Sequence, residues 1–105
     1  MTGAAIIASR AALKSGAGLV TLGTPESLGL LMNKVLIEAT KLFLPQTAEI
    51  SLDLAAYEKI VAYMKERKIS AMAIGPGISL ADKTQKLVRK LIPVIDAPLV
   101  LDATA

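Results

Sequence analysis

The chain has 105 residues, of which 53% are hydrophobic, and a formal net charge of +3 at pH 7. This length allows one domain at most, built around a single core. The longest stretch without a charged residue, Ile69 to Ala81, has 13 residues, fewer than the ~18–20 that a membrane-spanning helix needs. No basic residue precedes the first apolar residues, so the pattern of a secretory signal is missing. We expect a cytoplasmic protein without a membrane span.

The sequence contains no cysteine and no histidine. Disulfides, thiolate nucleophiles, zinc sites built from these residues and imidazole acid–base chemistry are therefore excluded. Only Phe43, Tyr57 and Tyr63 could stack on bases, so the positive charge does not by itself indicate a nucleic-acid partner, and we expect none. Four basic residues line one side of an expected helix, which we interpret as its solvated face. They are Lys83, Lys86, Arg89 and Lys90.

The start of the chain predicts a helix followed by a strand. Residues 3–15 are rich in alanine, a strong helix former. Gly16 is suited to the left-handed position after a helix, so we interpret Gly16 to Gly18 as a cap and turn. The apolar run at 19–22 predicts a short strand.

The next segment predicts a second helix and a second strand. Thr24 followed by Pro25 matches the pattern of a helix amino-terminal cap. We therefore expect a helix at 27–35. A strand is expected at 38–44, ended by Pro45.

The second half predicts a helix, a strand, a helix and a strand. Ser51 or Asp53 is expected to cap the first of these helices. The four elements are expected at residues 54–66, 70–74, 82–92 and 98–102. Helices alternating with strands predict an α/β fold with three αβα layers and a mostly parallel sheet. We expect at least three parallel strands side by side.

The segment Gly75-Pro76-Gly77 directly follows the apolar strand at 70–74. It matches neither the dinucleotide-binding fingerprint, which needs a glycine where Leu80 stands, nor a P-loop. Its glycines could bring backbone N–H groups close to a ligand at the carboxyl edge of the sheet. A tight turn without a ligand explains the three residues equally well.

Two further positions are candidates for the same edge. Asp102 ends the last apolar strand, where α/β proteins keep polar site residues, although a turn aspartate is the alternative. Thr2-Gly3-Ala4 opens the first helix, and its free N–H groups could bind an anion. No nucleophile with a paired base can be proposed from these residues.

Five motifs follow one another along the chain. They are Thr2-Gly3-Ala4-Ala5-Ile6, the segment from Arg10 to Thr21, Thr24-Pro25-Glu26, Ala73-Ile74-Gly75-Pro76-Gly77 and the segment from Pro98 to Ala103. Their order and spacing resemble the ADP/ATP-dependent NAD(P)H-hydrate dehydratase family of the ribokinase-like superfamily. One departure is Asp102-Ala103-Thr104, where the family commonly has Asp-Ala-Asp. The resemblance runs through the chain but covers only the first part of the family's domain, so we expect residues 1–105 to be the N-terminal part of such a domain, with a partial ribokinase-like fold.

The resemblance implies repair of hydrated NADH or NADPH by removal of water, driven by ATP or ADP with Mg²⁺. It implies that Ala4 and Gly77 contact the hydrated nucleotide. With their neighbours and the strand-end carboxylate, the expected substrate-binding residues are Gly3, Ala4, Gly75, Gly77 and Asp102. The family's nucleotide-binding segments and catalytic aspartate would lie beyond this chain, so no residue here is assigned the chemical step and no metal ligand is expected.

Two alternatives remain at this stage. One is a fragment of a related ribokinase-like kinase that phosphorylates a small molecule. The other is a non-catalytic chain, such as a split subunit or a folding fragment. Because a half-domain leaves apolar surface uncovered, we expect a homo-oligomer or a complex with a chain that supplies the missing half.

Overall fold

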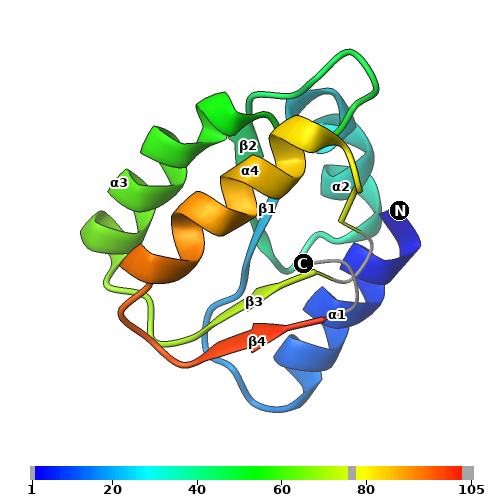
Figure 1. Cartoon of the computed structure of the whole chain (residues 1–105). Coiled ribbons are helices and arrows are strands. Elements are labelled where there is room, and N and C mark those ends of the chain that lie inside the picture. Colours follow the sequence, from blue (N-terminus) through cyan, green and yellow to red (C-terminus); the bar gives the residue numbers. More distant parts are fainter. Residues whose placement is uncertain (1, 76–77, 103–105) are drawn as a thin grey trace.

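The computed structural model describes residues 2–75 and 78–102. Helices and strands alternate along the chain, as the sequence predicts (Figure 1). The elements, with three short 3₁₀ turns labelled η, are α1 Thr2–Lys14, β1 Thr21–Pro25, η1 Glu26–Leu28, α2 Gly29–Val35, β2 Thr40–Leu44, η2 Leu54–Ala56, α3 Tyr57–Arg67, β3 Met72–Ile74, α4 Asp82–Leu91, η3 Ile92–Val94 and β4 Leu99–Leu101.

The four strands form two parallel pairs. β1 pairs with β2, with Thr21 opposite Thr40, and β3 pairs with β4, with Met72 opposite Leu99. The expected parallel direction is confirmed. The expected row of at least three hydrogen-bonded strands is not found among the described residues, which form two separate pairs. β3 and β4 are three residues long, so each offers few backbone groups to a further strand.

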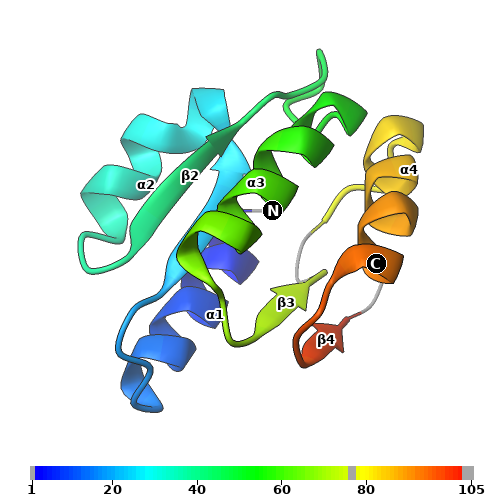
Figure 2. The ribbon, with the colours of Figure 1, turned by 90° about the vertical axis from the view of Figure 1, so that its left-hand side faces the viewer.

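Helices cover the strands on two faces, which confirms the expected αβα layers. α3 and α4 lie side by side on one face, and α1 lies on the other (Figures 1 and 2). Successive side chains of a strand point to opposite faces, and the neighbours Phe43 and Leu44 of β2 accordingly contact helices on opposite faces. Leu44 belongs to the buried cluster with Leu87 and Leu91 of α4. The Phe43 ring lies against Gly29 of α2.

One polar contact ties the layers together. The hydroxyl oxygens of Thr21 in β1 and Tyr63 in α3 lie 2.6 Å apart and form a half-buried hydrogen bond. This bond joins the first strand pair to the helix that precedes β3. It therefore helps to fix the position of α3, and with it the start of β3, relative to the first strand pair.

The interpretation of Thr24 as a helix cap is wrong. Thr24 is buried inside β1, opposite Phe43 of β2, and the strand continues to Pro25. Because Thr24 pairs with β2 as part of a strand, it is not the residue that begins a helix. The following turn begins after Pro25 without a side-chain cap. The first strand accordingly lies at 21–25 instead of 19–22.

Other local predictions are confirmed. Gly16 has a φ of +104°, as expected of the residue after a helix. Of the two proposed caps, it is the Asp53 carboxylate that accepts a hydrogen bond, from the Ala55 N–H at 3.3 Å. In the described part of the chain, no helix is long and apolar enough to cross a membrane.

Candidate functional site at the carboxyl edge of the strands

Gly75 and Asp102 meet where β3 and β4 end. Because the strands are parallel and in register, the residue after each lies at the same edge. The Asp102 N–H donates to the Ile74 carbonyl oxygen at 3.0 Å, which carries the pairing one residue beyond the strands. The sequence predicts Gly77 and Asp102 at one edge; Gly77 lies outside the described residues, and the structure places its neighbour Gly75 beside Asp102.

Only glycine fits at position 75. Its φ is +131°, and a Cβ atom built there would lie 2.3 Å from the Asp102 carbonyl oxygen. Side chains rarely adopt this backbone conformation, and no side chain could occupy this space without moving the backbone. The glycine is thus required by the close approach of two strand ends.

The chain turns sharply after Gly75. The Ile78 N–H donates to the Gly75 carbonyl oxygen at 2.8 Å, the hydrogen bond that closes a β-turn. The expected contact residue Gly77 lies outside the described residues. This bond is compatible with both interpretations of the segment, a tight turn alone and a turn that lies beside a ligand.

The start of α1 lies on the same side of the molecule as the ends of β3 and β4 (Figures 1 and 2). Gly3 is exposed, with nothing within 4 Å of where a Cβ would be, and Ala4 is half-buried. The first turn of this helix carries no acidic side chain, so its amide groups face no carboxylate of their own turn. Asp102 is also exposed.

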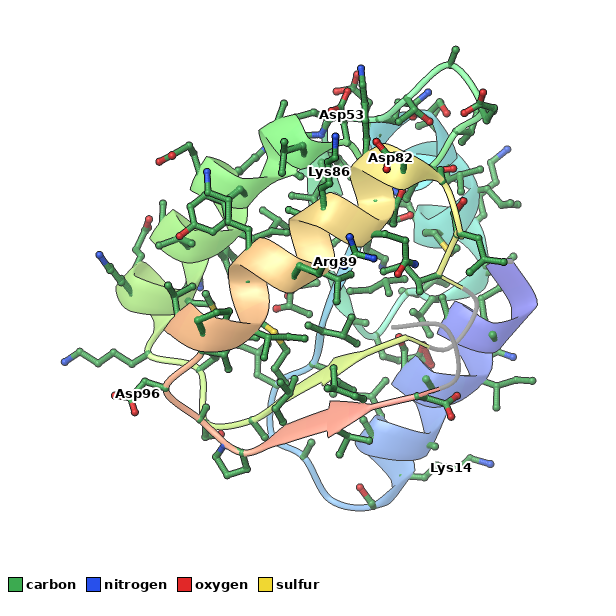
Figure 3. The ribbon with its side chains drawn as sticks, in the orientation of Figure 1. Lys14, Asp53, Asp82, Lys86, Arg89 and Asp96 are labelled. Atoms are coloured by element: carbon green, nitrogen blue, oxygen red, sulfur yellow. The ribbon has the colours of Figure 1, made fainter. Side chains whose placement is uncertain are left out.

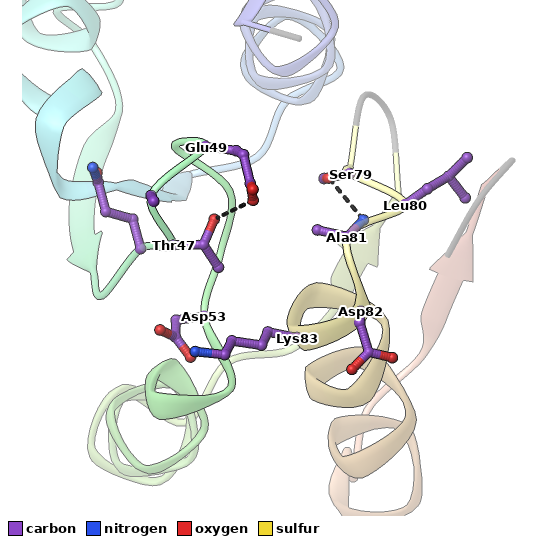
Figure 4. Close-up of a pocket in the computed structure, with 10 residues that line it drawn as sticks. Thr47, Glu49, Asp53, Ser79, Leu80, Ala81, Asp82 and Lys83 are labelled. Atoms are coloured by element: carbon purple, nitrogen blue, oxygen red, sulfur yellow. Dashed lines mark hydrogen bonds between the residues drawn. The ribbon is translucent and has the colours of Figure 1, made fainter.

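A hollow lies apart from these residues, and sequence reasoning missed it. It has a volume of about 770 Å³ and lies between the loop after β2 and the start of α4 (Figure 4). Thr47, Glu49 and Asp53 line one wall, and Ser79 and Lys83 line the other. In Figure 4 the Lys83 side chain extends toward Asp53. Only the position of the loop directly after a strand could have suggested it.

Hydrogen bonds hold the two walls of this hollow in place. Thr84 is fully buried, and its hydroxyl donates to the Leu52 carbonyl oxygen at 2.7 Å. Ser79 Oγ accepts from the Ala81 N–H at 2.9 Å and shapes the approach to α4. Because both walls are braced, the hollow is a fixed part of the fold.

No cluster of three acidic side chains that could hold a metal ion is found in residues 2–75 and 78–102. Mg²⁺ in nucleotide sites is usually held by one or two carboxylates together with water and substrate phosphates. In the wall of the hollow, Asp82 pairs with Lys86 at 3.0 Å (Figure 3), and Asp53 caps η2. These carboxylates already have structural partners.

These features define an α/β protein whose parallel strands open toward a ligand-accessible carboxyl edge, the usual binding edge of such sheets. Comparison with known proteins gives the family. The model of the NAD(P)H-hydrate dehydratase family matches residues 1–105. The chain belongs to this family, and its layers are part of the ribokinase-like fold.

Curated relatives match along nearly the whole chain. The bifunctional NAD(P)H-hydrate repair enzyme of Moorella thermoacetica is 36% identical over 105 residues, which is all of this chain and 19% of that protein. The ADP-dependent (S)-NAD(P)H-hydrate dehydratase of Bacillus subtilis is 32% identical over 105 residues, which is 34% of that protein. The chain thus spans only a fifth to a third of these relatives. No solved structure matches it significantly.

Proposed function

We propose that residues 1–105 form the first part of an NAD(P)H-hydrate dehydratase domain and carry part of its substrate site. The observation that supports this most directly is the contact between Gly75 and Asp102 at one strand edge, in a chain of this family. The activity proposed for the complete domain is removal of water from hydrated NADH or NADPH. ATP or ADP with Mg²⁺ would drive it, through residues outside this chain.

Each proposed contact has a distinct chemical role. The Asp102 carboxylate can accept hydrogen bonds from the hydroxyl or carboxamide groups of the hydrated nicotinamide. Gly75 leaves the edge open because it has no side chain, and we assign Gly77 a similar role from its motif alone. The N–H groups at Gly3 and Ala4 suit a phosphate oxygen. These residues bind and orient the nucleotide, and none of them is assigned the chemical step.

A partner is expected to complete the domain. Several large apolar side chains are strongly exposed, including Ile7 at 71%, Leu80 at 74% and Val100 at 65%. We propose that a chain supplying the rest of the domain, or a second copy of this chain, covers this surface. We also propose that the protein acts in the cytoplasm.

Binding of hydrated NADPH to the ¹⁵N-labelled chain tests the substrate site. Saturable NMR shifts at Gly3, Ala4, Gly75 and Asp102, larger than those with intact NADPH, are expected. The variant Asp102→Asn should weaken binding because it removes the negative acceptor. Asp96→Asn, which alters an exposed aspartate before β4, is the matched control and should bind normally. Equal weakening by both variants, or shifts located elsewhere, would refute the assignment.

A further inference from the structure

A second hollow lies at the other end of β3 and β4. It has a volume of about 460 Å³ and lies between the carboxyl end of α3 and the segment that leads from η3 into β4. Both segments precede their strands, so the hollow is at the amino edge. It is therefore separate from Gly75 and Asp102 and from the proposed substrate site.

The floor of this hollow is apolar. Val61, Met64 and Ile95 line it, and all three also pack against the buried cluster around Leu44 and Leu87. Small-molecule sites usually have volumes of ~300–1,000 Å³, mostly apolar walls and a few polar groups. The volume of the amino-edge hollow falls in this range, and its apolar floor is anchored in the core.

The rim of the hollow is positively charged. Lys65 and Lys68 line it, against the single carboxylate of Asp96. A third lysine, Lys90, lies nearby with its Nζ 4.3 Å from the ring centroid of Tyr57, another lining residue. The rim thus favours a negative ligand.

These lysines are not neutralised by ion pairs. Within residues 2–75 and 78–102, the ion pair found joins Lys86 to Asp82, both in α4 and away from the hollow. Lys65 and Lys68 therefore have no described carboxylate within 4.0 Å. A bound anion would supply the missing negative charge without displacing an existing partner.

We propose that the amino-edge hollow binds a small amphipathic carboxylate. Its apolar body lies on Val61, Met64 and Ile95, and its carboxylate lies between the ammonium groups of Lys65 and Lys68. Because the ligand contacts both α3 and the segment before β4, it stabilises the packing of one against the other. A ligand that binds only the folded chain raises its unfolding temperature.

Octanoate is the probe, and 1-octanol is its uncharged counterpart with the same apolar body. Titration of the ¹⁵N-labelled chain with octanoate should give saturable shifts in residues 61–69 and 94–97, with Gly75 and Asp102 unaffected. The thermal unfolding midpoint should rise with octanoate concentration. Octanol should bind about tenfold more weakly or worse, since a lost charge–charge contact of ~1.4 kcal/mol corresponds to that factor.

Lysine variants test the role of the rim. Lys65→Gln and Lys68→Gln should each weaken octanoate binding and leave octanol binding unchanged. Lys14→Gln, at the end of α1 (Figure 3), removes one positive charge elsewhere and should bind octanoate normally. A cooperative thermal unfolding transition of each variant without ligand shows that it is folded. If one lysine variant does not fold, the other carries the test.

Three results would overturn the proposal. They are the absence of saturable octanoate binding, octanol binding as tight as octanoate binding, and shifts located outside the two segments. None of these results bears on hydrated NADPH, whose shifts are expected at the opposite strand edge. The two proposals therefore stand or fall separately.

Discussion

At the scale of single residues, two glycines stand where a neighbouring group leaves no space for a side chain. Gly75 allows the end of β3 to lie against the backbone of Asp102, and Gly29 allows α2 to lie against the Phe43 ring. The two contacts differ in kind. The first neighbour is backbone, which cannot move without breaking the strand pair, and the second is a side chain.

Replacement of Gly75 by alanine should destabilise the chain strongly. The new Cβ would lie 2.3 Å from the Asp102 carbonyl oxygen, and the φ of +131° is unfavourable for alanine. We expect a loss of roughly 1–3 kcal/mol or more in the free energy of unfolding, measured by urea denaturation. Gly3→Ala, in open space within α1, is the control and should be neutral or slightly stabilising. Equal stability of the two variants would contradict the close approach.

Replacement of Gly29 by alanine should cost less and should be reversible by a second change. The Cβ would lie 2.7 Å from the Phe43 ring, and overpacking of this kind costs roughly 1–3 kcal/mol. Alanine regains roughly 0.5–1 kcal/mol over glycine within a helix, so the net loss should be smaller than at Gly75. Phe43→Leu removes the ring edge and should recover part of the stability in the double variant. A double-mutant cycle measures this coupling, and strictly additive effects would argue against the contact.

At the scale of elements, a buried threonine links α4 to the loop after β2. Thr84→Val keeps the shape of the side chain but removes the donor to the Leu52 carbonyl oxygen. An unsatisfied buried carbonyl should cost about 1–3 kcal/mol. Thr40→Val, at an exposed position of β2, is the matched control and should change the urea midpoint little. A comparable loss in both variants would show that the Thr84 bond is not special.

Local patterns predicted most elements but not how they assemble. The amphipathic patterns of α3 and α4 predicted both helices, because α4 buries one face and α3 packs one half-buried face against the same cluster. The cap pattern at Thr24 misled, because pairing with β2 outweighed a local preference. The division into two strand pairs depends on tertiary packing, which no local pattern encodes.

Only part of the candidate site could be predicted, because local patterns locate strand ends but not contacts between distant segments. Gly75 and Asp102 could be placed together because each follows a strand in a parallel arrangement. The hollow beside the start of α4 could not be predicted, because its walls are joined by a bond between residues 32 positions apart in the sequence. Nothing near Leu52 in the sequence identifies Thr84 as its partner.

At the scale of the whole molecule, the exposed apolar side chains predict association. Ile7, Leu30, Ile37 and Leu80 are each more than 70% exposed. We expect the chain to self-associate, or to bind a chain that supplies the rest of the domain, with roughly 1,000 Å² or more buried. Sedimentation velocity over a dilution series measures this. A cooperatively unfolding monomer at low micromolar concentration would contradict the prediction.

The isolated chain should not catalyse repair. It spans a fifth to a third of its curated relatives, and the resemblance places the nucleotide-binding segments and the catalytic aspartate outside it. We expect no ATP- or ADP-dependent conversion of hydrated NADPH. The assay measures the recovery of NADPH absorbance. Turnover by the purified chain, with a mock purification as control, would show that catalytic residues lie within these 105 positions.

The bond between Tyr63 and Thr21 also makes the chain suitable for optical study. The sequence has no tryptophan and two tyrosines, and both tyrosines lie in α3. The Tyr63 hydroxyl is hydrogen-bonded to Thr21 of β1, and the Lys90 ammonium of α4 lies over the Tyr57 ring. Tyrosine emission from the unlabelled chain therefore reports on whether α3 is docked against both the first strand pair and α4, and it does so without an engineered fluorophore.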